Sequence, residues 1–173
     1  KNGVLYYLSL TNTGPGLGYS CQTFKSTDGG VTYGPPVQAT GGDKSWYLID
    51  TTNSPGSGFQ YQPWSLGGLA DQAFSRSTDQ AATWLNPPVT PVPVWGTLDV
   101  NSAGDLYVGG LDFAGSSTTT FFCAKSTNAK NAAVTPTFTT FNVPMGGSIG
   151  FNVTGSPNPG GLLGQASLCV DRS

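Results

Sequence analysis

The sequence predicts an all-β protein of short antiparallel strands, and three observations lead to this prediction. Of the 173 residues, 25 are glycine and 13 are proline, so turn-forming residues are frequent along the whole chain. Charged residues make up only 9%, which leaves few of the straight-chain side chains that favour long helices. Short runs rich in Val, Thr, Tyr and Phe alternate with the turn clusters, as β-strands do.

The charge balance excludes several classes of function. The nine acidic residues are all aspartates, there are seven basic residues and no histidine, and the formal net charge is −2. Such a chain lacks the basic surface that nucleic acids and anionic membranes require, and no apolar run approaches the roughly 20 residues that span a bilayer. The low charge and the abundance of Ser, Thr, Asn and Gly favour an extracellular or cell-surface location.

The three cysteines, Cys21, Cys123 and Cys169, do not have the spacing of a zinc site. The sequence implies no metal and no organic cofactor, and Ca²⁺ on the Asp-rich loops is left open. Ordinary buried thiols are the default expectation for all three, and a bridge between Cys123 and Cys169 is left open.

A nine-residue stretch at residues 25–33 recurs twice further along the chain. It reads Lys-Ser-Thr-Asp-Gly-Gly-Val-Thr-Tyr, and residues 76–84 read Arg-Ser-Thr-Asp-Gln-Ala-Ala-Thr-Trp. A shorter copy, Lys-Ser-Thr-Asn-Ala-Lys, occupies residues 125–130. The serines of successive copies lie 51 and then 49 residues apart. The Ser, Asp and Gly content of each copy predicts the turn of a β-hairpin.

Four strand-like segments, which we label A to D, recur in the same order around each copy. The repeated turn joins segment C to segment D. The first unit has expected strands at 4–10, at 19–24 and around Val37, and the second at 45–50 (a buried central strand), 59–66, 71–75 and a proline-broken 89–94. In the third unit they are expected at 95–100, 105–110, 118–124 and 138–143, followed by a last segment at 166–171.

Four short antiparallel strands in about 50 residues is the period of a β-propeller blade. We therefore expect one partial propeller domain over residues 1–173. Its parts are strands B, C and D at 1–40, a second blade at 41–94, a third blade at 95–165 with an insertion at 145–164, and strand A of a next blade at 166–173. Because propellers typically have about four to eight blades, these three are expected to belong to a six-bladed ring. The rest of that ring would come from a longer protein, of which this chain is a fragment, or from a second copy.

The repeated stretch resembles the Asp-box, Ser-x-Asp-x-Gly-x-Thr-Trp, of the sialidase-like family with bacterial neuraminidase (BNR) repeats. Tyr33 stands where that family has Trp, the second copy has Ala81 at the Gly position, and the third has Asn128 for Asp. With its flanking strands, the resemblance covers essentially the whole chain. It implies a structural role in the hairpin turn, not catalysis, for Ser26, Asp28, Gly30, Tyr33, Ser77, Asp79, Trp84, Ser126 and Asn128.

The resemblance also implies a ligand site near the propeller axis, on the face away from the Asp-box turns. Loops from D to A and from B to C would reach that face. Sugars stack on exposed aromatic rings and hydrogen-bond to charged side chains, so the ligand-binding candidates are Asp43, Lys44, Trp46, Trp64, Asp71 and Trp95. The ordinary alternative is packing between blades for each tryptophan, and a solvated turn for each aspartate, including Asp112.

Two functions follow from the resemblance. Sialidase chemistry needs three arginines on the substrate carboxylate and a Tyr nucleophile paired with Glu, but this chain has only Arg76 and Arg172 and no Glu. No catalytic residue is assigned. We expect a secreted carbohydrate-binding or protein-interaction scaffold whose partners are glycans or another protein chain. The alternative is a fragment of an exo-sialidase-like glycoside hydrolase whose catalytic residues lie mostly outside this chain.

Overall fold

The computed structural model describes residues 3–12, 14, 18–65, 73–89, 92–111, 117–150 and 166–172. These residues form ten β-strands and no helix. The strands are β1 (Leu5–Asn12), β2 (Tyr19–Ser26), β3 (Val37–Thr40), β4 (Leu48–Ile49), β5 (Gln60–Pro63), β6 (Phe74–Ser77), β7 (Val94–Val100), β8 (Leu106–Leu111), β9 (Ser117–Ser126) and β10 (Thr139–Gly150). The all-β prediction is confirmed for this part of the chain.

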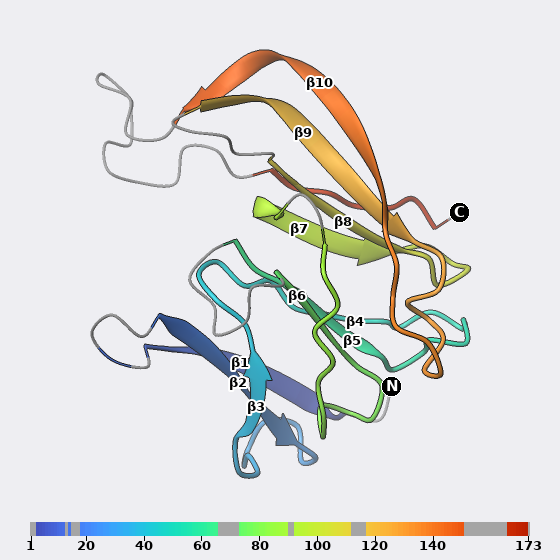
Figure 1. The fold of residues 1–173 in the computed structure, drawn as a ribbon. Helices are drawn as coiled ribbons and strands as arrows, with labels where there is room; N and C mark the ends of the chain where they lie inside the picture. Colours follow the sequence, from blue (N-terminus) through green and yellow to red (C-terminus); the bar gives the residue numbers. More distant parts are fainter. Residues whose placement is uncertain are drawn as a thin grey trace.

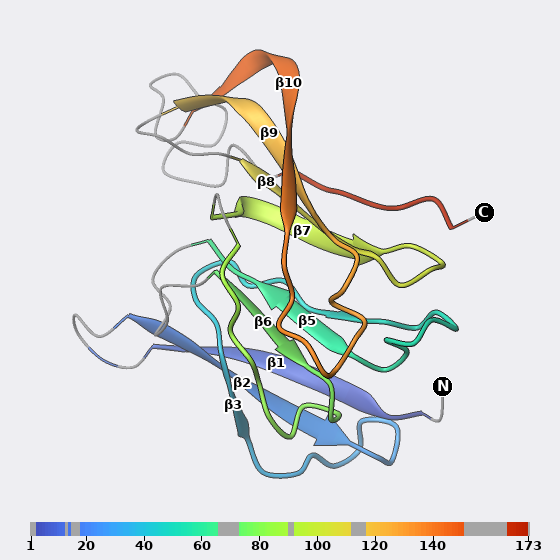
Figure 2. The ribbon, with the colours of Figure 1, turned by 45° about the vertical axis from the view of Figure 1, so that its right-hand side comes forward.

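The strands form three antiparallel sheets, each a meander in chain order. The first sheet is β1-β2-β3, the middle sheet is β4-β5-β6, and the last sheet is β7-β8-β9-β10. Figure 1 and Figure 2 show the sheets stacked in chain order, with the middle sheet between the other two. No closed barrel or ring is formed by the described strands.

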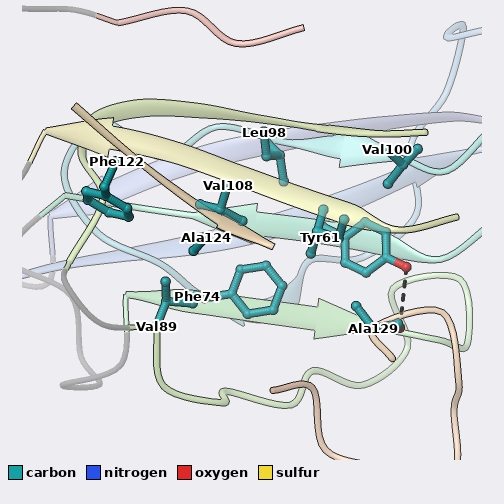
Figure 3. Packing of buried hydrophobic residues seen from close by; sticks show 10 residues of the cluster. Tyr61, Phe74, Val89, Leu98, Val100, Val108, Phe122, Ala124 and Ala129 are labelled. Atoms are coloured by element: carbon teal, nitrogen blue, oxygen red, sulfur yellow. Dashed lines mark hydrogen bonds between the residues drawn. The ribbon is translucent and has the colours of Figure 1, made fainter. Parts of the chain in front are cut away.

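The middle and last sheets share the larger hydrophobic core. Its ten buried side chains are Tyr61, Phe74, Val89, Leu98, Val100, Leu106, Val108, Phe122, Ala124 and Ala129. Figure 3 labels nine of them, all but Leu106, and shows their side chains gathered between the two sheets. Each large apolar side chain buried in this way stabilises the fold by about 1.5–3 kcal/mol, so this core accounts for the close packing of the two sheets.

The first and middle sheets meet through polar side chains instead. Gln62 and Ser75 of the middle sheet are completely buried, as is Cys21 of β2. The Ser75 hydroxyl donates to the carbonyl oxygen of Ala39 in β3 at 3.4 Å. Buried polar groups need such partners to offset the loss of water, and here the partners come from the neighbouring sheet.

The last sheet lies close to where the sequence predicts it. The segments expected at 95–100, 105–110 and 118–124 correspond to β7, β8 and β9. Strand β10 is longer than the expected 138–143, because it runs to Gly150 with a register irregularity after Pro144. Residues 145–150, which were expected to begin an insertion, therefore belong to this strand.

The middle sheet differs more from the prediction. The run at 45–50 forms a strand only at Leu48–Ile49 and is half-buried, not a buried central strand. No strand forms within the described part of 89–94 before β7, and the expected fourth strand is reduced to one bridge between Leu85 and Arg76. Prolines explain this, because Pro87, Pro88 and Pro93 have no N–H to donate to a ladder.

The segment at 166–172 is extended but is not a ladder strand. It runs parallel to β7, where its amide nitrogens meet mainly side chains: Leu168 N donates to Thr97 Oγ1 at 2.8 Å and Val170 N to Asp99 Oδ2 at 2.9 Å. Figure 2 shows it alongside the last sheet. The prediction of a strand at 166–171 is therefore wrong, although the segment lies beside β7 and Ala166 N donates to the Trp95 carbonyl at 3.1 Å.

Candidate functional site

The loop after β3 carries three of the predicted ligand-binding residues and is held against the middle sheet. Gly41 has φ +94°, and a Cβ there would lie 2.5 Å from the Cys21 sulfur, so only glycine fits. Further along, the Asp43 carbonyl accepts from Ser65 N at 2.9 Å, and Trp46 N donates to the Pro63 carbonyl at 3.1 Å. The loop is thus fixed at its beginning and its end.

Ser45 holds the same loop from the inside. Its hydroxyl donates to the Gly42 carbonyl at 2.8 Å and accepts from Gly42 N and from Gln62 Nε2, both at 3.2 Å. The Cys21 thiol donates to the same oxygen at 3.4 Å. The sequence did not indicate this role of Ser45, because no neighbouring residue shows that its hydroxyl contacts both β2 and β5.

The last residue of β3 and one residue of this loop lie in the left-handed region that L-residues rarely occupy. Thr40 has φ 58° and Lys44 has φ 54°. Such a conformation costs roughly 1–2 kcal/mol for a residue with a side chain. Strain of this kind is retained only where the surroundings impose it, and it concentrates at binding sites.

The outer surface of the loop combines an ion pair with an exposed indole. Lys44 Nζ lies 2.6 Å from Asp43 Oδ2, and both side chains are half-buried. The Trp46 side chain is 45% exposed. This loop therefore carries charged donor and acceptor groups and an exposed aromatic side chain within four consecutive positions.

The other two predicted tryptophans are buried. Trp64 is 2% exposed and Trp95 is 7% exposed, and Trp95 packs with Val94 and Leu111 in a second, smaller core. Trp95 N also donates to Ser65 Oγ at 2.9 Å. Both tryptophans therefore pack inside the protein and offer no face for stacking a sugar. Their burial agrees with a packing role, and the ligand-binding prediction for them has no support in this structure.

Two loop aspartates singled out from the sequence, Asp71 and Asp112, lie outside the described residues. Among the residues that are described, no group of three His, Cys, Asp or Glu side chains could hold a metal ion.

The cysteines are unpaired in the structure. Cys21 is buried, Cys123 is partly buried and Cys169 is exposed. The bridge between Cys123 and Cys169 is not formed, and the expectation of a buried thiol is wrong for Cys169. Burial raises the pKa of the Cys21 and Cys123 thiols, so both stay protonated and are weak nucleophiles.

The first repeated turn, between β2 and β3, is closed by its own side chains. Ser26 Oγ accepts from Gly30 N at 2.9 Å and donates to Asp28 Oδ1 at 2.7 Å. The Asp28 carboxylate accepts from Val31 N at 3.1 Å, from Thr32 N at 3.0 Å and from the Thr32 hydroxyl at 2.5 Å. These bonds from Thr32 hold the pKa of the Asp28 carboxyl well below its usual range.

The second turn repeats this arrangement. Ser77 Oγ accepts from Ala81 N at 2.9 Å and donates to Asp79 at 2.8 Å, and Thr83 donates to Asp79 from its backbone at 2.9 Å and from its hydroxyl at 2.5 Å. Burial raises the pKa of Asp79, but the hydrogen bonds from Thr83 and Ser77 outweigh it and the net pKa is lowered. Both carboxylates are therefore committed to their own turns.

The third turn uses an amide in place of the carboxylate. Ser126 Oγ accepts from Ala129 N at 3.1 Å and donates to Asn128 Oδ1 at 2.9 Å. Thr137 takes the place of Thr32: its N–H donates to Asn128 Oδ1 at 2.9 Å, and its hydroxyl accepts from Asn128 Nδ2 at 3.1 Å. The sequence did not indicate this role of Thr137, because a longer loop separates it from the motif.

The aromatic residues that follow the first two turns have different surroundings. Tyr33 is 48% exposed and lies edge-on to Tyr7, with ring centroids 6.5 Å apart. Trp84 is partly buried and packs against Tyr47 at 6.2 Å. Only Trp84 is enclosed by its neighbours, and Tyr33 remains open to solvent.

Both arginines of the chain are engaged. Arg76 is 3% exposed, and its guanidinium donates to the carbonyls of Ala129 and Asn131 at 2.9 Å and of Val134 at 2.8 Å. Burial lowers its pKa. Arg172 Nη2 donates to Asp99 at 2.5 Å. Arg76 thus joins β6 to the third repeated turn.

The chain matches no protein-family model, no curated protein and no solved structure at a significant level. The part of the chain that the structure describes contains no helix long and apolar enough to cross a membrane.

Proposed function

We propose that the three sheets are consecutive blades of an Asp-box β-propeller that acts as a secreted, non-catalytic carbohydrate-binding scaffold. The stacking of antiparallel meanders in chain order supports this architecture. The shared hydrogen-bond pattern of the three repeated turns supports the resemblance to the Asp-box family. The low charge of the chain supports an extracellular or cell-surface location.

The observation that carries the binding function is the exposed Trp46 in the same short loop as the Asp43–Lys44 ion pair. An indole face stacks on the apolar face of a sugar ring, while a carboxylate and an ammonium serve its hydroxyls. The hydrogen bonds from Ser65 and to Pro63 hold this loop in place before a ligand arrives, which lowers the entropy cost of binding.

The second candidate, a sialidase-type hydrolase, has less support in this chain. A sialidase uses arginine forks that are free to bind a carboxylate. Here Arg76 is buried on backbone carbonyls and Arg172 is paired with Asp99. We therefore expect no turnover of a fluorogenic sialoside by the purified chain, and turnover that survives purification to homogeneity would favour the hydrolase.

A glycan array with matched variants tests the binding function. We expect Trp46→Ala to weaken binding to the preferred glycan by about tenfold, which corresponds to the loss of about 1.4 kcal/mol of stacking. Trp46→Phe should recover part of the affinity, because a smaller aromatic face remains. The control is Val31→Ala, which truncates another exposed apolar side chain on a different loop. Unchanged binding by Trp46→Ala, or binding of no glycan at all, would contradict the proposal.

A further inference from the structure

A cleft of about 740 Å³ lies between the first and second repeated turns. Its walls come from β2, from the turn that follows β2, and from residues 79–82. Because β3 begins at this turn and ends at the loop holding Trp46, the cleft and that loop lie at opposite ends of the strands. The volume falls in the range of sites for small ligands, about 300–1,000 Å³.

The second turn keeps two side chains at the cleft in a strained conformation. In the first turn, Gly29 and Gly30 have φ 77° and 92°, and at the equivalent positions Gln80 and Ala81 have φ 62° and 66°. Glycine would serve both positions without strain. A side chain that is retained at such a position needs a reason beyond the turn itself.

The Gln80 side chain reaches across the cleft. Its Oε1 accepts from Lys25 Nζ at 2.7 Å, and the ammonium also lies 5.8 Å from the centre of the Tyr6 ring. Lys25 forms no ion pair with a carboxylate within the described ranges. Gln80 therefore positions an ammonium group that is not neutralised by a direct partner, and its own Nε2 remains available as a donor.

The remaining walls favour an uncharged ligand that is rich in hydroxyls. The exposed Tyr33 ring, Thr27 and Asp79 line the same cleft. Asp79 and the adjacent Asp28 are two negative charges against the single positive charge of Lys25, so an anion is repelled. An aromatic face with ammonium, amide and hydroxyl donors is the combination that a neutral sugar ring requires.

We propose that this cleft is a second binding site, which takes a neutral saccharide unit between Tyr33 and the Lys25–Gln80 pair. Lys25 and Gln80 hydrogen-bond to sugar hydroxyls, and Tyr33 covers one face of the ring. The site stands apart from the Trp46 loop, so either proposal can fail alone.

Amide chemical-shift mapping by NMR tests the site with neutral tetrasaccharides (cellotetraose, maltotetraose, xylotetraose and chitotetraose) and with tetragalacturonate as the acidic comparison. We expect at least one neutral probe, at millimolar concentration, to shift the amides of residues 26–34 and 79–82. Tetragalacturonate should leave these amides unchanged. No shift with any neutral probe, or a preference for the acidic one, would overturn the proposal.

Gln80→Gly separates binding from folding. It relieves the positive φ, so we expect the thermal midpoint to rise by about 2–4 °C, while the dissociation constant for the neutral probe increases about tenfold. Lys25→Met should weaken binding to a similar extent, and Trp46→Ala should leave binding at the cleft unchanged. Wild-type affinity in both Gln80→Gly and Lys25→Met would rule out this cleft as the site.

Discussion

The Asp28 carboxylate accepts four hydrogen bonds within a nine-residue turn, one from Ser26, one from Val31 and two from Thr32. In the third turn the uncharged Asn128 takes the place of this carboxylate. Because Thr32 and the backbone favour the ionised form, the pKa of Asp28 is lower in the folded protein than in the unfolded chain. The contribution to stability is therefore fully present above the unfolded pKa of about 4 and is lost as the pH falls toward the folded value.

We expect Asp28→Asn to be less stable than wild type at neutral pH, with the difference shrinking as the pH falls below about 4. Asn can still accept from the backbone, as Asn128 does, so the turn should form. Urea unfolding at a series of pH values measures the difference. Thr32→Val is the matched variant, because it removes the hydroxyl that contributes most to the lowered pKa and should reduce the pH dependence. A difference that does not change with pH would contradict this account.

The tryptophans show the limit of sequence reasoning for single side chains. Trp46, Trp64 and Trp95 all lie near strand ends, yet their exposed fractions are 45%, 2% and 7%. The local sequence does not distinguish them, because burial depends on which side chains from other parts of the chain cover each ring. Trp95 is covered by Val94 and Leu111 in a small core that no local pattern reveals.

Among the strands, those of the first sheet and the first three strands of the last sheet lie closest to the predicted ranges. Alternation of β-branched and aromatic residues between turn signals located β7, β8 and β9. The same reasoning failed between Leu85 and β7. Successive prolines removed ladder donors there, and one bridge to Arg76 is all that forms.

Arg76 links elements that the strand pattern alone does not connect. It extends from β6 to three carbonyls of the third repeated turn, at Ala129, Asn131 and Val134. The sequence placed Arg76 beside a repeated turn but gave no sign of these partners, which are 53 to 58 residues away. The bonds hold the middle and last sheets together at one end.

We expect Arg76→Met to lower the free energy of unfolding by about 3 kcal/mol, because three carbonyls, one of them on the buried Ala129, lose a charged donor. The stability of Arg76→Lys should lie between those of Arg76→Met and wild type, since one ammonium cannot reproduce the geometry of the guanidinium fork. Urea unfolding with an unchanged slope measures the loss. Arg172→Met is the control, because its ion pair is exposed and should cost less than about 1 kcal/mol. Equal stability of Arg76→Met and wild type would show that the hydrogen bonds of Arg76 do not contribute to the free energy of unfolding.

The two junctions between sheets differ in kind across the whole molecule. Between the middle and last sheets lies a core of ten buried apolar residues (Figure 3). Between the first and middle sheets, the Ser75 hydroxyl donates to the Ala39 carbonyl, and the Cys21 thiol donates to Ser45, which is bonded in turn to Gln62. A hydrogen bond contributes about 1 kcal/mol net, whereas a large apolar side chain contributes about 1.5–3 kcal/mol on burial. The first sheet is therefore held to the rest more weakly.

This asymmetry predicts that the first sheet opens before the other two. In native-state hydrogen exchange, we expect the amides of β2 to show a smaller free energy of opening than those of β8 and β9. Phe122→Ala should lower the opening free energy in the middle and last sheets by about 3–5 kcal/mol, because it leaves a cavity in their shared core. The β2 amides should change less, since they already exchange by local opening. If all three sheets instead exchange with one common free energy that Phe122→Ala lowers equally, the polar junction is as strong as the apolar one, and the three sheets unfold as a single cooperative unit.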